Sequence, residues 1–264
     1  NGSTQTINTV VQPDLVWFKK RSSTGSHALV DAVRGDTKWL ESDGTAAEQT
    51  FANNNVTTNA TSIDLDYNGG YNNINQSSQT YVAWNWKANG SGSSNSNGSI
   101  TSTVSANVDA GFSIVSYTGT DNDETVGHGL SKAPEVVIVK RRNSSGNWAS
   151  AWTPIASSSN QMYLNSTAAA ESNNVNTFNA TTFRVNGWSD VVVNGGTYIA
   201  YAFHSVDGYS KVGSYTGNGN ADGPFVYTGF RPAFVMVKSA SMSNSETNWV
   251  IWDNERNGYN DNVQ

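Results

Sequence analysis

Short stretches with apolar side chains at alternate positions recur along the chain. Residues 80–86 and 197–203 show this period of two, which is the spacing of side chains on one face of a β-strand. Val136–Val139 is apolar at every position, which is typical of a strand buried on both faces. Only Thr45–Gln49 and Thr167–Glu171 have helical character, over one or two turns each. The pattern predicts an all-β protein.

Similar sequences recur in several of the predicted strands. A Tyr-Thr-Gly sequence closes both Gly111–Gly119 and Gly208–Gly217, and the two copies lie 98 positions apart. The Pro-led strands Pro134–Lys140 and Pro232–Lys238 are separated by the same 98 positions, and Pro13–Lys19 has the same form. Because one offset accounts for two separate matches, we interpret the chain as repeated β-units.

The later strands of the first two copies also match. Asn59–Leu65 resembles Asn179–Val185, and Thr80–Trp86 resembles Thr197–Phe203, at slightly different offsets. The first copy lacks the Tyr-Thr-Gly strand, and the last copy stops soon after Asp253. We therefore expect the sequence to begin and end inside a repeated architecture.

Composition at the junctions sets the expected domain boundaries. Residues 89–106 are rich in Gly, Ser and Asn, which is typical of a flexible linker or of a long surface loop between two sheets. We expect a first β repeat at residues 1–88, a second at 107–206 and a truncated third at 207–264. Each is predicted to be an antiparallel β-sandwich.

Charge and composition narrow the class of function. The 264 residues carry 15 Lys+Arg against 21 Asp+Glu, a net charge of −6, so the basic surface that nucleic acid requires is missing. No apolar run approaches the ~20 residues of a membrane-spanning helix, and we expect no membrane insertion. The chain has no Cys, which removes disulfides and thiolate chemistry. Nine Trp, 11 Tyr and 9 Phe supply large side chains for a folded core.

Few residues have the spacing of a catalytic or metal site. The three histidines, His27, His128 and His204, belong to no metal or triad motif, and we interpret them as structural. Asp121–Glu124 is the densest acidic loop, but it lacks the spacing and the glycine of a calcium loop, so we interpret it as a solvated turn. The sequence predicts no metal and no cofactor.

A glycosidase would need two carboxylates facing one cleft. Asp64 and Asp66 alternate on one strand face, but the matching positions of the next copy hold Arg184 and Asn186. We therefore predict that the protein is not an enzyme, with a polysaccharide depolymerase as the catalytic alternative.

Two turns share an Asp-x-x-Arg spacing after a strand. They pair Asp31 with Arg34 and Asp253 with Arg256, whereas Thr153 stands at the expected position of the second copy. A carboxylate and a guanidinium at this spacing form a bidentate pair, and we interpret both as ion pairs that fix a turn. Sugar binding by the same pair is the alternative.

The nine tryptophans suit either packing or recognition, because exposed indole faces stack on sugar rings as they stack at interfaces. Four recur at strand positions and are expected in the core or at an interface: Trp148, Trp152, Trp249 and Trp252. Trp39 and Trp188 lie in less regular contexts. They are our candidate ligand-binding residues, with a glycan as the expected ligand.

The repeated strings resemble an uncharacterised repeat domain of marine tailed-bacteriophage virion proteins. The resemblance is carried by Gly111–Gly119, Pro13–Lys19 and Ser26–Gly35, and most specifically by His204–Lys238. It implies jelly-roll or lectin-like β-sandwich domains in a virion component such as a tail fibre. It brings no catalytic residues with it.

We therefore expect a bacteriophage virion structural protein, a tail-fibre, spike or capsid-surface component involved in host-surface attachment. Its expected location is the particle surface. Its expected partners are other virion proteins or copies of itself in a homo-oligomer, and a host-surface glycan. Two alternatives stay open: a structural or decoration subunit without a ligand, and a bacterial extracellular adhesin or filament subunit.

Overall fold

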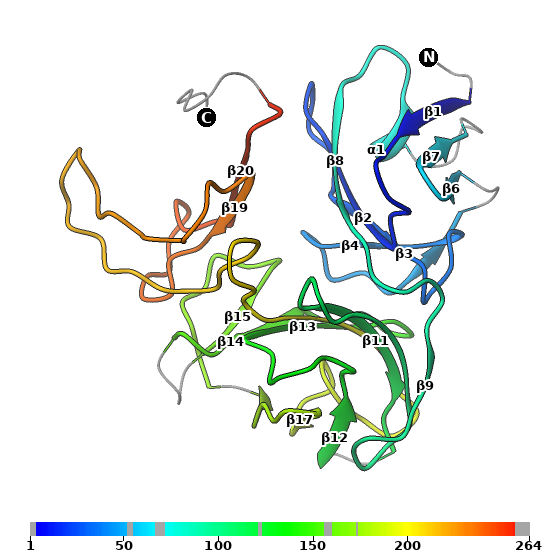
Figure 1. The fold of residues 1–264 in the computed structure, drawn as a ribbon, viewed down its shortest axis with the longest axis vertical. Coiled ribbons are helices and arrows are strands. Elements are labelled where there is room, and N and C mark those ends of the chain that lie inside the picture. Colours follow the sequence, from blue (N-terminus) through cyan, green and yellow to red (C-terminus); the bar gives the residue numbers. More distant parts are fainter. Residues whose placement is uncertain are drawn as a thin grey trace.

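The computed structural model describes residues 4–51, 55–66, 72–120, 123–155, 160–172 and 174–256. Their regular structure is antiparallel β apart from the one-turn helix α1 (Asn72–Asn75), so the predicted all-β class is confirmed. The strands fall into three groups along the chain, which lie around a common centre (Figure 1). We call them the N-terminal unit (residues 4–88), the central unit (89–206) and the C-terminal unit (207–256).

The N-terminal unit consists of two antiparallel sheets. The larger sheet has the strand order β5 (Gln49–Thr50), β4 (Lys38–Glu41), β3 (Ala28–Asp31), β2 (Leu15–Lys20) and β8 (Tyr81–Trp86). The smaller sheet has the order β1 (Gln5–Asn8), β7 (Ser62–Leu65) and β6 (Val56–Thr58). Val16 and Phe18 of β2 pack with Ile63 and Leu65 of β7 in one buried cluster, which holds the two sheets together as a sandwich.

The central unit also consists of two antiparallel sheets, and its larger sheet is wider than that of the N-terminal unit. Its larger sheet has the order β15 (Gln161–Tyr163), β14 (Trp148–Trp152), β13 (Val136–Arg141), β18 (Thr197–Phe203), β11 (Phe112–Thr118), β10 (Ser102–Asn107) and β9 (Ser93–Asn95). Its smaller sheet has the order β12 (Asp123–Gly127), β17 (Thr182–Asn186) and β16 (Val175–Asn176).

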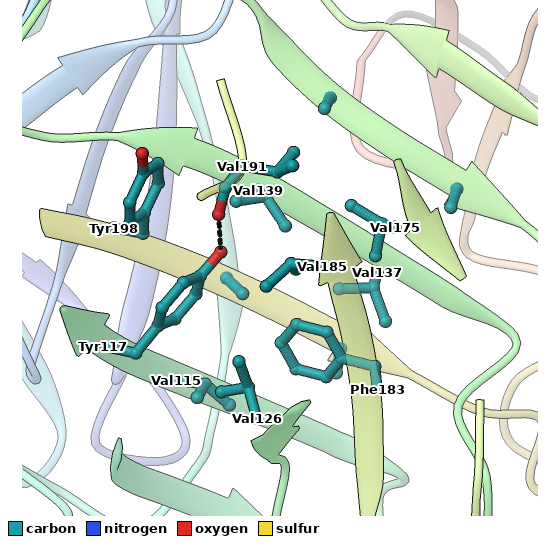
Figure 2. Close-up of a cluster of buried hydrophobic side chains, with 14 of the residues drawn as sticks. Val115, Tyr117, Val126, Val137, Val139, Val175, Phe183, Val185, Val191 and Tyr198 are labelled. Carbon is teal, nitrogen blue, oxygen red and sulfur yellow. Dashed lines mark hydrogen bonds between the residues drawn. The ribbon is translucent and has the colours of Figure 1, made fainter. Parts of the chain in front are cut away.

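Figure 2 shows the core between the two sheets of the central unit. Val137 and Val139 of β13 face Phe183 and Val185 of β17, and all four side chains are fully buried. The hydroxyl of Tyr117 donates a 2.6 Å hydrogen bond to the carbonyl oxygen of Val191, which satisfies the polar end of a buried ring.

The Gly/Ser/Asn-rich stretch expected as a linker or loop contributes β9 and most of β10 to the seven-stranded sheet. Two of its glycines, Gly92 and Gly98, allow close packing. Gly98 has φ +103°, and a Cβ on it would collide with the carbonyl oxygen of Thr125. The Ser105 hydroxyl accepts a 2.7 Å hydrogen bond from the Asn89 amide. Here the small polar residues serve backbone contacts, so their composition does not indicate flexibility.

Gly98→Ala is expected to destabilise the protein by about 1–3 kcal/mol, because alanine disfavours this φ and has no room for its methyl group. Urea unfolding followed by tryptophan fluorescence measures the change. Gly90→Ala is the matched control, since Gly90 has φ +64° with no atom within 4 Å of an added Cβ. A loss no larger than that of Gly90→Ala would show that residues 89–106 do not pack as described.

The helical character expected at Thr45–Gln49 and Thr167–Glu171 is wrong. Neither segment is helical. The amide of Glu48 donates to the carbonyl oxygen of Arg142 and the amide of Ala170 to that of Ala240, both at 2.8 Å. These amides bond to a neighbouring unit and therefore not to a preceding helical turn.

The C-terminal unit has one described sheet, the hairpin of β19 (Phe234–Val237) and β20 (Val250–Asp253). The sequence places a strand at Gly208–Gly217 by its match to β11, but these residues join no sheet. In the central unit β11 pairs with β10 and β18, and the described part of the C-terminal unit has no counterpart of either strand. Residues 208–217 therefore have no neighbouring strand with which to form a sheet.

One apolar cluster, which we call the junction cluster, collects side chains from all three units. Its buried members come from the N-terminal unit and the central unit: Leu15, Trp17, Leu29, Leu40, Trp84, Ala88, Phe112, Ile114, Val136, Ile138, Trp148, Ile199 and Tyr201. The C-terminal unit adds partly buried side chains: Val212, Phe234, Met236 and Ile251. On β2 and β13 these residues alternate with those of the sandwich cores, so both faces of each strand are buried.

The three Pro-led strands pair with the following strand in one register. Leu15 lies opposite Asp31, Val136 opposite Trp152, and Phe234 opposite Asp253. We call residues related by this register corresponding positions. The register also corrects the sequence alignment, because Trp152, and not Thr153, corresponds to the two aspartates.

The order of neighbouring strands bears on the expected sandwich type. In the N-terminal unit, β2 to β5 are consecutive in sequence and adjacent in one sheet. This is a meander, whereas a jelly roll consists of two Greek keys. The β-sandwich-like architecture is confirmed, and the jelly-roll form is not.

Candidate functional site

The Asp31–Arg34 pair closes the turn after β3. Asp31 Oδ1 accepts the amides of Val33 (3.1 Å) and Arg34 (2.9 Å), and Asp31 Oδ2 accepts Arg34 Nε at 2.5 Å. Arg34 Nη2 donates to the carbonyl oxygen of Leu29 at 2.9 Å. Both side chains of the pair are fully buried. The pair therefore fixes the turn as predicted, but through the single side-chain contact Nε–Oδ2 and not through the expected bidentate one, and it lies inside the molecule.

The central unit supplies further partners to this buried pair. The Tyr201 hydroxyl donates to Asp31 Oδ2 at 2.7 Å. Glu48 lies 3.4 Å from Arg34 Nη1 and accepts two hydrogen bonds from Arg142, at 2.8 and 3.0 Å. Burial and the Asp31 carboxylate raise the pKa of Tyr201 well above its usual value, so its hydroxyl stays a donor. Charged groups of two units thus form one network.

The Asp253–Arg256 pair has the same geometry in the C-terminal unit. Asp253 Oδ1 accepts the amides of Glu255 (3.1 Å) and Arg256 (2.9 Å), and Oδ2 accepts Arg256 Nε at 2.6 Å. Arg256 Nη2 donates to the carbonyl oxygen of Ile251 at 2.7 Å. This pair is less buried than the first, with 27% of the Arg256 side chain exposed.

Trp84 of the N-terminal unit donates a hydrogen bond to Asp253, as Tyr201 does to Asp31. Its Nε1 donates to Asp253 Oδ2 at 3.0 Å, and the Arg256 guanidinium lies 5.2 Å from its ring centroid. Trp84 lies opposite Trp17 on β2 and Tyr201 opposite Ile138 on β13, so the two donors are at corresponding positions. Both were missed in the sequence, although each is an aromatic hydrogen-bond donor in a matching strand.

Two further tryptophans join units through their indole N–H. Trp148 Nε1 donates to the carbonyl oxygen of Glu41 at 2.6 Å, and Trp249 Nε1 to that of Tyr163 at 2.9 Å. The donors are at corresponding positions, and so are the acceptors, because Glu41 lies opposite Ala28 and Tyr163 opposite Ala149. Their expected place in the core or at an interface agrees with these contacts.

The other two strand tryptophans differ from each other. Trp152 is partly buried and packs against Trp249, with ring centroids 5.4 Å apart. Trp252 was expected in the core or at an interface, but 53% of it is exposed. It lies on the face of β20 that no described sheet covers.

The two candidate ligand-binding tryptophans occupy different environments. Trp39, on β4, is partly buried and stacks on Phe51, with ring centroids 5.9 Å apart. Trp188 follows β17, directly after Gly187 with its φ of +77°, and 55% of the residue is exposed. Trp188 therefore has an indole surface that a ligand can reach, and most of the Trp39 surface is used in packing.

Each of the three histidines has a ring nitrogen within hydrogen-bond distance of a polar group. His128 is fully buried; its Nδ1 accepts the amide of Leu130 at 3.1 Å, and its Nε2 lies 3.1 Å from the carbonyl oxygen of Asn179. His204 Nδ1 lies 2.9 Å from the carbonyl oxygen of Ser205. His27 Nδ1 accepts Trp17 Nε1 at 3.2 Å. These contacts fit the structural roles expected from the sequence.

His27 should make stability depend on pH. Burial, followed by the charge of Lys19, lowers its pKa to about 4. An unfolded histidine titrates near 6.5, so between about pH 6.5 and 4 the unfolded chain binds more protons. Stability should therefore fall by about 2–3 kcal/mol as pH drops through this window, and this residue should have no effect above it. Urea titrations of the wild type and His27→Gln at about pH 7 and pH 4.5 test this. An unchanged pH dependence in His27→Gln would assign the effect elsewhere.

A cavity of about 230 Å³ lies where the three units meet. The N-terminal unit contributes Trp17, His27 and Asp43, and the C-terminal unit contributes Asn248 and Trp249.

The acidic positions singled out in the sequence bind neighbouring side chains. Asp123 pairs with Arg184 at 2.6 Å, whereas residues 121 and 122 lie outside the described residues. Asp64 accepts the Thr6 hydroxyl at 2.6 Å, and Asp66 accepts the Thr4 hydroxyl at 2.5 Å. Within the described ranges, no group of three or more His, Asp or Glu side chains could hold a metal ion.

The fold and these contacts define the class as a β-sandwich-like, all-β protein whose buried polar clusters join its own units. Over residues 1–264 the chain matches the family model Domain of unknown function (DUF7483), and it belongs to that family. No curated protein and no solved structure matches it. In the part of the chain that the structure describes, no helix is long and apolar enough to cross a membrane.

Proposed function

We propose that the chain contains three copies of one β-unit, two sandwiches and a partial third copy, and that these copies form a closed ring. Support comes from the shared register and from the repeated contacts. Donors of the central unit (Trp148, Tyr201) reach the N-terminal unit, Trp84 of the N-terminal unit reaches the C-terminal unit, and Trp249 of the C-terminal unit reaches the central unit. Head-to-tail contacts of one rotational sense generate a ring when the rotation closes.

We further propose that this ring is a structural component of a bacteriophage virion, a tail-fibre, spike or capsid-surface element that takes part in host-surface attachment and is not an enzyme. The observation that carries the proposal is that aromatic donors of one unit bond to an Asp–Arg turn or a backbone carbonyl of another and so join unit to unit. A rigid β-scaffold of this kind suits a particle component that presents loops at its surface. The resemblance of His204–Lys238 to a phage virion repeat supplies the viral assignment.

Location on the particle can be tested directly. Antibodies raised against the purified chain should label purified phage particles in electron micrographs, at a tail or capsid position. Labelling of bacterial cell envelopes in uninfected cultures would instead favour a bacterial adhesin or filament subunit.

Attachment is expected to depend on Trp188. The chain should bind intact host cells and their extracted surface polysaccharide saturably. Trp188→Ala should weaken this binding at least tenfold, or by about 1.4 kcal/mol, because the exposed indole face that stacks on a sugar ring is lost. Trp39→Ala is the matched control and should leave affinity nearly unchanged, since its ring packs on Phe51. Binding measured by fluorescence titration and cell sedimentation reports both variants.

Two results would count against the attachment role. Saturable binding that survives Trp188→Ala would remove the assigned contact. If an oligomeric preparation does not bind, the result would favour a structural or decoration subunit without a ligand, in which the contacts between units serve only to build the scaffold.

A further inference from the structure

His27 stands where the other two units have a tryptophan that joins units. The shared register makes three residues corresponding positions, each of them four residues before the last residue of its strand β3, β14 or β20: His27, Trp148 and Trp249. Trp148 and Trp249 each donate to a carbonyl oxygen of a neighbouring unit. The N-terminal unit thus has a titratable side chain at a position that fixes a junction elsewhere.

The hydrogen bond of His27 requires its neutral form. Trp17 Nε1 donates to His27 Nδ1 at 3.2 Å, and a protonated Nδ1 would present a second N–H to the indole. Trp17 packs edge to face on Trp84, with ring centroids 6.0 Å apart, and Trp84 donates to Asp253 of the C-terminal unit. Protonation of His27 therefore breaks the first contact in a short path that ends at the junction between the N-terminal and C-terminal units.

The charged groups around His27 come from three elements. Lys19 on β2 and Arg256 after β20 disfavour an imidazolium, whereas Asp43 after β4, whose Oδ1 accepts the His27 amide at 2.9 Å, favours it. Burial disfavours it more than any of these charges, so the pKa of His27 is lowered to about 4. Part of this burial comes from the C-terminal unit, since Trp249 lines the cavity beside His27. Separation of the two units would hydrate the imidazole and remove Arg256, which favours the protonated form.

We propose that His27 makes the junction between the N-terminal and C-terminal units an acid-sensitive contact, closed near neutral pH and opened when this imidazole is protonated. The direction follows from linkage, because the open state binds the proton more tightly than the closed state and so gains population as the pH falls from about 6.5 to 4. The other two junctions have a tryptophan at the corresponding position, which does not titrate, and should stay closed.

The acceptor at this junction does not titrate in the same window. Burial raises the pKa of Asp253, but the hydrogen bonds from Trp84 and from the amide and side chain of Arg256 outweigh it, and the pKa is lowered below its usual value. Asp253 therefore stays ionised at about pH 4.5, and loss of the Trp84 hydrogen bond at that pH reports on the junction.

One indole N–H crosses each junction, so hydrogen exchange followed by NMR on isotope-labelled tryptophan reports all three in one sample. Trp84 Nε1 joins the N-terminal and C-terminal units, Trp148 Nε1 the central and N-terminal units, and Trp249 Nε1 the C-terminal and central units. Between about pH 7 and pH 4.5, the exchange rate of Trp84 in the intact chain should rise at least about tenfold relative to the His27→Gln variant at the same pH. The exchange rates of Trp148 and Trp249 should equal those of the variant.

His27→Gln is the matched control, because it cannot be protonated and because comparison at equal pH cancels the direct effect of acid on exchange. His27→Trp, which installs the residue of the corresponding positions, is a second neutral variant and should also keep Trp84 protected. The imidazole signals of the three histidines, followed in the same samples, give the pH at which His27 takes up its proton.

Three results would overturn the proposal. Equal acceleration at Trp84, Trp148 and Trp249 would mean that acid loosens the whole molecule. An acid response that persists in both His27 variants would assign it to another group. Titration of His27 near its ordinary pKa with Trp84 still protected would mean that the closed junction accommodates the imidazolium. None of these results bears on labelling of particles or binding to cells, so the proposed function can fail or stand independently.

Discussion

Asp31→Ala is expected to lower the free energy of unfolding by about 3–5 kcal/mol, the cost of leaving a buried charge without its partner. Arg34 would stay fully buried beside a methyl group, and Tyr201 and two backbone amides would lose their acceptor. In the wild type, burial lowers the pKa of Arg34, but the Asp31 carboxylate outweighs this and raises it above its usual value. Urea unfolding followed by tryptophan fluorescence measures the loss.

The chain contains its own control for this substitution. Asp253→Ala removes the same hydrogen bonds from the corresponding turn, but Arg256 is partly exposed and water can solvate it. The expected loss is about 1–2 kcal/mol. The double variant Asp31→Leu/Arg34→Met should recover much of the stability lost in Asp31→Ala, since an apolar pair leaves no buried charge. Equal losses in Asp31→Ala and Asp253→Ala would contradict the assigned role of burial.

Trp148→Ala is expected to cost about 3–5 kcal/mol, as large-to-small replacements in a core do. The residue is fully buried in the junction cluster and stacks on Tyr201, with ring centroids 6.4 Å apart. Its indole N–H also joins the central unit to the carbonyl oxygen of Glu41. Thermal unfolding and urea titration should both report the loss, and tryptophan fluorescence should show a more hydrated junction.

Two matched variants separate the contributions at this position. Trp148→Phe keeps most of the apolar volume and removes the indole donor, so about 1–2 kcal/mol is expected. Trp249→Ala removes the corresponding donor from the C-terminal unit, where the side chain is only partly buried, and should cost less than Trp148→Ala. If Trp249→Ala proved the more damaging variant, the C-terminal junction would hold the molecule together instead of the N-terminal one.

The sequence was enough to predict those strands and turns that depend only on residues close together in the chain. The alternation in residues 197–203 reflects which face of β18 each side chain occupies, and neighbours in sequence determine it. The Asp31 and Asp253 turns were also predictable, since all groups that close each turn lie within five residues of the aspartate. The short stretches taken for helix were wrong because their amides bond to another unit.

Several features had no local signal at all. Residues 89–106 resemble a linker in composition, yet Gly92 and Gly98 lie against another stretch of backbone and the Ser105 hydroxyl accepts a backbone amide. Trp39 was predicted as a ligand contact, but its ring packs on Phe51. Trp252 sits at a repeated strand position but is exposed, because the described C-terminal unit lacks the sheet that covers its counterparts.

The amino-acid sequence alone was sufficient to predict the all-β class and the two Asp-x-x-Arg turns, because strand periodicity and short-range hydrogen bonds depend on residues close together in the chain. That these turns face neighbouring units, and that Tyr201 and Trp84 donate hydrogen bonds to their aspartates, is visible only in the folded chain. Tyr201 lies 170 positions from Asp31, and Trp84 lies 169 positions from Asp253. Contacts at that separation depend on how whole sheets pack around the junction cluster, and no local pattern specifies that packing.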